Sequence, residues 1–163
     1  MITSGRPRPP ENAGELRTLE LAGLASAILL FHSSLTLAAD PSDVRQPITL
    51  TPTEYSWLLN EMRGHLNAIG AAQEALSTGD METARQAMLE RGTARLKAPG
   101  RLSFPQKVTD AWRGMAIGMH QSYDAVAEGI ANKETASQIM GRTAKLMQYC
   151  AGCHVSYRLV ATP

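Results

Sequence analysis

Aromatic residues, cysteines and surplus charge are all scarce in this sequence. Aromatic residues make up 5% of its 163 residues, and only two residues are cysteine. Two cysteines exclude a small domain held together by several disulfides. The 16 Lys and Arg residues and the 15 Asp and Glu residues leave a net charge of +1. No basic surface for nucleic acid and no acidic tail is indicated, so we expect no nucleic-acid partner.

Alternation of apolar and polar residues over the length of a strand is also absent, and we expect no sheet. Apolar residues instead recur at spacings of three and four from Thr51 onward, which is typical of amphipathic helices. The apolar residues are mainly Ala, Leu, Ile and Met, which favour helices. Four such segments with short connections predict an all-α fold, an antiparallel four-helix bundle.

The first 39 residues differ from the rest of the chain. A polar stretch is followed by an uncharged apolar run over 21–31 and then by a segment that ends in small residues. This order is typical of a secretory signal peptide, and the run is shorter than the roughly 18–20 residues that span a bilayer. We expect cleavage after Ala38 or Ala39 and export to the periplasm. An uncleaved membrane anchor is the alternative.

Proline and capping residues predict how the remaining chain is divided. Residues 40–51 are expected to be an extended lead-in, and residues 52–163 the helical domain. Thr51 to Glu54 combine an N-cap threonine, a proline in the first turn and a glutamate at the third helical position, which predicts a helix start. The expected helices begin after Thr51, after the cap Asp80, after the cap Ser103 and at Asn132 or Lys133, and the last runs to Val160.

The residues with distinctive chemistry stand together as Cys150-Ala151-Gly152-Cys153-His154. This C-x-x-C-H pattern is the attachment motif of c-type haem. Two thiols at this spacing reach the two vinyl groups of one porphyrin, and the histidine that follows binds the iron. On a helix, Cys150, Cys153 and His154 share one face. We therefore expect the bundle to enclose one covalently bound haem c, with His154 as its proximal ligand.

Three other interpretations of the cysteine pair are open at this stage. A thioredoxin-like redox pair needs a strand-helix context that this chain lacks. Zinc needs a fourth ligand such as His65 or His120, and the adjacent Cys153 and His154 fit a tetrahedral ion poorly. A disulfide within one helix constrains little. The predicted export favours haem, because bacterial systems attach it outside the cytoplasmic membrane.

The segment CAGCHVSYRLV at 150–160, on the last of four expected helices and close to the end of the chain, resembles the cytochrome c-prime family. The similarity covers roughly residues 51–160, although outside this segment it consists of the helix pattern alone. The resemblance implies a periplasmic bundle with one covalent haem, often assembled as a homodimer. It also implies an arginine beside the proximal histidine, and Arg158 stands one turn beyond His154.

The resemblance leaves the second axial position of the iron open. Some members of the family leave it vacant beneath an apolar residue of the first helix, whereas others place a methionine there. Met62 lies in the middle of the first apolar stripe, and methionine is a known haem ligand. His65, three residues on, is the competing ligand. We expect Met62 to bind, with His65 or an open position as alternatives.

The axial ligands decide which function is expected. Met62 and His154 together predict a one-electron carrier that exchanges electrons with redox partner proteins. An open position instead predicts a module that binds NO or CO. A haem peroxidase needs an acid-base group beside the iron. Only His65 is available for that role and no partner that orients it is visible, so we expect no enzyme.

Overall fold

The computed structural model describes residues 42–97 and 107–163, and these residues are mostly helical. The predicted signal peptide and the cap expected at Ser103 lie outside them. The four α-helices are α1 (Pro52–Ser77), α2 (Met81–Leu89), α3 (Asp110–Ala131) and α4 (Ala136–Ser156). A short 3₁₀-helix, η1 (Thr93–Lys97), follows α2. The expected helical class is confirmed for this part of the chain.

Capping side chains set where the helices begin. At the start of α1, the Thr51 hydroxyl accepts a hydrogen bond from the backbone N–H of Glu54, and the Glu54 carboxylate accepts one from Thr51 N–H. This reciprocal cap was predicted from the sequence and is confirmed. An equivalent pair, Thr135 and Gln138, begins α4. The prediction that the fourth helix starts at Asn132 or Lys133 is therefore wrong, because the later threonine supplies the cap.

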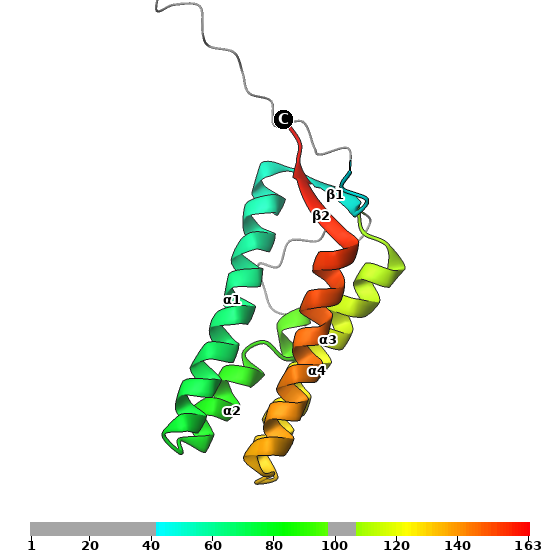
Figure 1. Ribbon diagram of the computed structural model, residues 1–163. Coiled ribbons are helices and arrows are strands. Elements are labelled where there is room, and N and C mark those ends of the chain that lie inside the picture. Colours follow the sequence, from blue (N-terminus) through cyan, green and yellow to red (C-terminus); the bar gives the residue numbers. More distant parts are fainter. Residues whose placement is uncertain (1–41, 98–106) are drawn as a thin grey trace, which may run out of the picture. The chain divides into compact units, whose positions relative to one another are not determined.

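The helices pack in chain order, α1 on α2, α2 on α3 and α3 on α4 (Figure 1). Gly79 makes the tight turn between α1 and α2 with φ 80°, a conformation in which a side chain is strained. By contrast, α1 makes few direct contacts with α3 and α4. Helix α1 is therefore largely separated from α4, which carries the C-x-x-C-H motif, and from α3.

A two-stranded parallel sheet joins the two ends of the described chain. Strand β1 (Gln46–Leu50) pairs with β2 (Tyr157–Ala161), and Ile48 lies opposite Leu159. The expectations of no sheet and of a fourth helix that runs to Val160 are wrong, and β1 lies within the segment that was expected to be an extended lead-in. Helix α4 ends at Ser156, and Tyr157 turns the backbone into an extended conformation. The pairing buries Ile48 and Leu50, which are 3% and 0% exposed.

The apolar core is divided into two clusters. One lies among the four helices and consists of Ala68, Ile69, Ala72, Ala75, Ala84, Met88, Tyr123, Val126, Ala127, Ile130, Ile139 and Leu146. The other lies beneath the sheet and consists of Ile48, Leu50, Leu58 and Val108. No helix that the structure describes combines the length and apolar character needed to cross a membrane.

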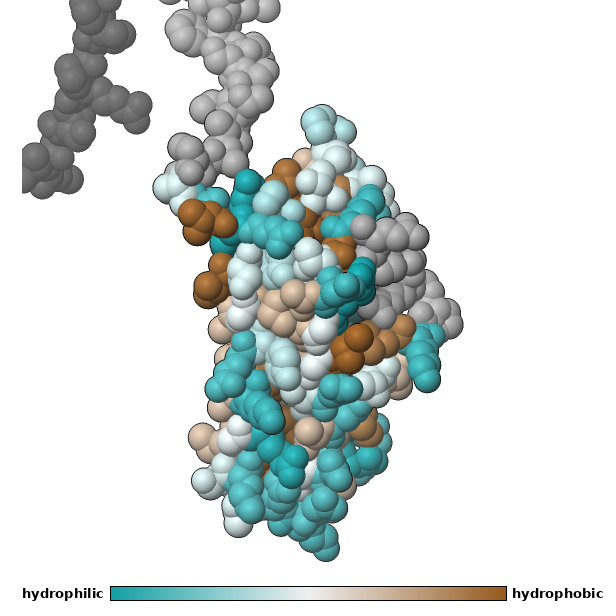
Figure 2. Space-filling model, turned by 90° about the vertical axis from the view of Figure 1, so that its right-hand side faces the viewer, coloured by the Kyte–Doolittle hydropathy of each residue, from teal (hydrophilic) through white to brown (hydrophobic). Residues whose placement is uncertain are grey.

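Several large apolar side chains are left on the surface of the described residues. They are Val44, Leu66, Met81, Ile117, Met140, Met147 and Val155. On the face shown in Figure 2, hydrophobic residues appear as separate patches among hydrophilic ones. Two of the exposed residues, Leu66 on α1 and Met147 on α4, differ from the others because they line a cavity.

Candidate functional site

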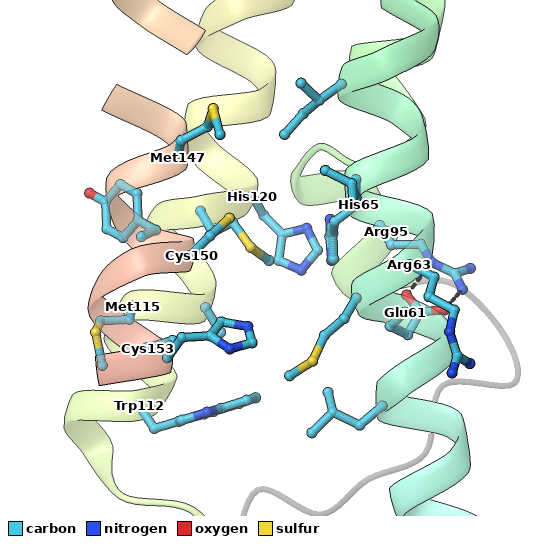
Figure 3. Close-up of a pocket in the computed structure, with 18 of the residues that line it drawn as sticks. Glu61, Arg63, His65, Arg95, Trp112, Met115, His120, Met147, Cys150 and Cys153 are labelled. Atoms are coloured by element: carbon cyan, nitrogen blue, oxygen red, sulfur yellow. Dashed lines mark hydrogen bonds and ion pairs between the residues drawn. The ribbon is translucent and has the colours of Figure 1, made fainter. Parts of the chain in front are cut away.

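A cavity of about 410 Å³ lies between α1 and the pair α3 and α4 (Figure 3). Its lining includes Ile69 and Met119 from the helical cluster and Leu58, Met62 and Trp112 from the cluster beneath the sheet. Protein interiors rarely contain voids larger than a water molecule. A cavity of this size, between two parts of the core, is in the range of cofactor and ligand pockets.

The C-x-x-C-H motif supplies the α4 wall of this cavity. Cys150, Cys153 and His154 all line it. Both cysteines are free thiols and half-buried, and burial raises the pKa of each. The i, i+3, i+4 spacing therefore places all three side chains on the cavity side of α4, as predicted from the sequence.

Gly118 on α3 allows α4 to pack closely against α3. The Tyr149 ring, which also lines the cavity, packs over Gly118, where a Cβ would collide with ring atoms. The absence of a side chain at Gly118 therefore sets how closely α3 and α4 approach beside the motif.

The α1 wall carries both residues that were considered as second axial ligands. Met62 is half-buried and His65 is buried, and both line the cavity. Figure 3 shows His65 on α1, across the cavity from Cys150 on α4. The buried face of α1 is nevertheless not purely apolar, because Glu61 and His65 are buried. Leu66, which is 65% exposed, lines the cavity together with Met62 and His65.

The His65 ring is neutral and has an unsatisfied nitrogen. Burial, with smaller contributions from His120 and Arg91, lowers the pKa of His65 to about 4. Its Nδ1 is buried and has no hydrogen-bond partner among the described residues. An unpaired buried polar atom costs about 1–3 kcal/mol. A neutral imidazole with an unused nitrogen is therefore held in the wall of the cavity.

Aromatic neighbours fix the orientation of this ring. The His120 ring lies edge-on to it with centroids 5.2 Å apart, and the Tyr123 ring lies 5.3 Å away. The Tyr123 hydroxyl donates a hydrogen bond to the His65 carbonyl at 2.8 Å. His120 is fixed in turn, because its Nδ1 lies 2.7 Å from the carbonyl oxygen of Arg91. A carbonyl oxygen only accepts, so His120 Nδ1 carries the hydrogen.

A buried ion cluster next to His65 was missed at the sequence level. Glu61 is 8% exposed and accepts hydrogen bonds from Arg95 Nη2 at 2.5 Å and from Arg91 Nη1 at 3.3 Å. Burial alone raises the pKa of Glu61, but the Arg95 hydrogen bond and the charges of both arginines outweigh it and lower that pKa. Gly64 makes this possible, because a Cβ there would collide with the Arg91 guanidinium.

The arginines reach Glu61 because α3 holds the segment that carries them. The Asp124 carboxylate on α3 accepts hydrogen bonds from the backbone N–H and the hydroxyl of Thr93, at 3.0 and 2.6 Å. These contacts fix the start of η1, from which Arg95 extends. No local pattern in α1 indicates that a glutamate three residues before a glycine will be buried by arginines from another segment.

Replacing Glu61 with glutamine is expected to lower the free energy of unfolding by about 2 kcal/mol. The change leaves two arginines without their shared carboxylate, and breaking a buried pair costs more than breaking an exposed one. Breaking a fully buried pair costs about 3–5 kcal/mol. Both guanidiniums are partly exposed, so the expected loss of stability is smaller than that. Denaturant titration of the purified protein measures it. Glu74→Gln, at an exposed site on the same helix, is the control, and an equal loss there contradicts the prediction.

Arg158 does not join the other predicted site residues. It lies on β2 rather than on a helix and is absent from the described lining of the cavity. Its Nε is 3.8 Å from Asp43 Oδ2. Asp43 also pairs with Arg45 at 2.8 Å, and Arg45 Nη1 donates to the His154 carbonyl at 3.3 Å. The end of the motif is therefore tied to the residues before β1.

The cavity lining includes donor types that are able to hold a haem, namely thiols, a thioether and imidazoles. Within residues 42–97 and 107–163, no group of three or more His, Cys, Asp or Glu side chains is placed to hold an ion. The α4 wall has two thiols and a histidine, and the α1 wall has a thioether and a neutral imidazole.

Comparisons with known proteins add no further identification. A scan of protein-family models, a search of curated proteins and a search of solved structures each find no match to this chain. The resemblance to the cytochrome c-prime family therefore rests on the residues at 150–160 and on the helix pattern.

Proposed function

We propose that this protein is a periplasmic c-type cytochrome of the cytochrome c-prime type, which carries one electron at a His/Met-ligated haem. One observation carries the proposal: the three functional side chains of the C-x-x-C-H motif line the same cavity as Met62 and His65. The packing of successive helices in chain order supports an antiparallel four-helix bundle around that haem. The uncharged run at 21–31 supports export.

Each residue of the site has one task in this proposal. Cys150 and Cys153 hold the haem through thioether bonds, and His154 is the proximal ligand. Met62 on the α1 wall is the second axial ligand. Arg63 also lines the cavity and supplies positive charge for a carboxylate of the haem, whereas Arg95 in the same lining is paired with Glu61. The remaining lining is mostly apolar.

The haem supplies the exchange of one electron between ferric and ferrous iron. The protein keeps both axial donors on packed helices, so that the ligand set changes little between the two states. The Arg45 contact to the His154 carbonyl and the pairing of β1 with β2 hold the end of α4 in place. A rigid ligand set is what a carrier requires, whereas capture of a gas requires a free or easily displaced position.

Binding of NO or CO is the second candidate function. The observation that favours it is the unpartnered Nδ1 of His65 in the cavity wall, since a polar nitrogen there has no task in a carrier ligated by Met62. In this alternative the iron is five-coordinate and the α1 side of the cavity receives the gas.

One absorption spectrum of the purified protein, recorded oxidised and reduced, separates the two functions. We expect a low-spin ferric spectrum with the weak near-infrared band of thioether ligation. A high-spin ferric spectrum in the unmutated protein contradicts Met62 ligation and favours gas binding. A protein purified without any haem contradicts both functions.

A further inference from the structure

We propose that His65 is a hydrogen-bond donor to a diatomic ligand with an accepting terminal oxygen, bound in this cavity when Met62 does not bind the iron. The inference rests on the proposed function, because the cavity must hold a haem. It goes beyond that function by assigning a ligand class to the α1 wall and one residue that recognises it.

The first support is the burial of an unused nitrogen. His65 is 8% exposed, and its Nδ1 has no partner among the described residues. A neutral imidazole always has one N–H donor and one acceptor nitrogen. Buried polar groups are nearly always hydrogen-bonded in native proteins. Nδ1 is thus closed off from the cavity, and no protein group holds the ring proton on it. The N–H of this cavity-lining side chain can therefore lie on the other nitrogen, Nε2.

The second support is that the neighbouring imidazole is committed elsewhere. His120 donates its Nδ1 hydrogen to the Arg91 carbonyl oxygen at 2.7 Å. The N–H at His120 Nδ1 is therefore already used, whereas no hydrogen bond among the described residues uses the N–H of the His65 ring. Of the other α1 residues in the wall, Met62, Leu66 and Ile69 have no polar hydrogen, while Trp57 and Arg63 carry N–H groups. His65 is thus the imidazole of this pair whose N–H no described hydrogen bond occupies.

The third support is that the ring is already oriented. His120 and Tyr123 pack against it at 5.2 and 5.3 Å, and the Tyr123 hydroxyl binds the His65 carbonyl. A donor that is held before the ligand arrives loses little conformational freedom on binding. The α1 wall across from Cys150 therefore offers an oriented donor in mainly apolar surroundings, where a hydrogen bond is stronger than in water.

The test uses carbon monoxide and the ferrous Met62→Ala protein, in which the second axial position is open. Met62→Ala/His65→Leu is expected to shift the infrared C–O stretch to higher wavenumber, because a donor to the ligand oxygen lowers it. Carbon monoxide dissociation is expected to become about fivefold faster, equivalent to the loss of about 1 kcal/mol. Met62→Ala/His65→Gln, which keeps an N–H donor, is expected to retain most of the lower frequency.

Gln73→Leu in the same Met62→Ala background is the matched control. Gln73 is an exposed residue of α1 that is absent from the described lining of the cavity, and its change is expected to leave the C–O stretch in place. A stretch that is unchanged by His65→Leu in a haem-loaded protein overturns the inference and leaves the cytochrome proposal standing. Low-spin iron that persists in Met62→Ala and disappears in the double variant also overturns it, because His65 is then an iron ligand. Absence of haem from the unmutated protein refutes the cytochrome proposal and the inference together.

Discussion

Replacing both Cys150 and Cys153 with alanine is expected to remove covalent haem from the protein completely. The two thiols lie on the cavity wall and are free, so in the proposed cytochrome they are the residues that form thioether bonds to the porphyrin. The unmutated protein is expected to keep its colour after denaturation in acidified organic solvent, and its mass to include one haem. The double variant is expected to lose the haem to the solvent under the same conditions.

The single variants and His154→Ala separate attachment from ligation. Cys150→Ala and Cys153→Ala each leave one thioether and are expected to retain the haem on extraction. His154→Ala removes the proximal ligand and is expected to destabilise the fold, because the haem is a large share of the core of so small a domain. An unmutated protein whose haem is extracted by the solvent contradicts the attachment model at its base.

Met62→Ala is expected to turn the ferric iron from low-spin to high-spin and to open it to carbon monoxide. The thioether of Met62 is the sulfur donor that the α1 wall presents to the cavity, and alanine has no atom that reaches across. The near-infrared band is expected to disappear, and the ferrous protein to bind carbon monoxide that the unmutated protein does not. Absorption spectra of both oxidation states measure these changes.

Two other methionines are the controls for this result. Met147 lines the cavity from α4, and Met88 lies in the helical cluster away from it. Met147→Ala and Met88→Ala are both expected to leave the spectrum nearly unchanged. If a low-spin spectrum survives Met62→Ala but is lost in His65→Ala, the iron is bound by two imidazoles. The carrier function then stands with a lower potential than a His/Met site has.

Local signals in the sequence predicted the start of α1 and the grouping of the motif residues on one face of α4. Thr51 and Glu54 form their cap within four residues, and Cys150, Cys153 and His154 share a face through helix geometry alone. Such features depend on neighbours along the chain. They are readable without knowledge of the tertiary structure.

Features that depend on distant partners were not predicted. Glu61 is buried because Arg91 and Arg95 arrive from beyond α2, so the apolar residues alone did not reveal the full buried face of α1. The end of α4 carries no glycine or proline signal, and Tyr157 becomes a strand residue because β1 is available to pair with it. Which strand pairs with β2 is decided by the tertiary structure and not by the sequence of either strand.

The pairing of β1 with β2 also has a consequence for the order of folding. It joins the beginning and the end of the described chain, so the whole intervening polypeptide must be closed into a loop before it forms. Contacts between distant segments form slowly because of this loss of chain entropy. Helix α4, which carries the thiols, forms from local contacts. Strand β2 comes directly after it in the sequence but needs the distant β1 to pair with. In the proposed cytochrome we therefore expect the two cysteines to remain accessible to the attachment machinery until late in folding, when the last strand pairs.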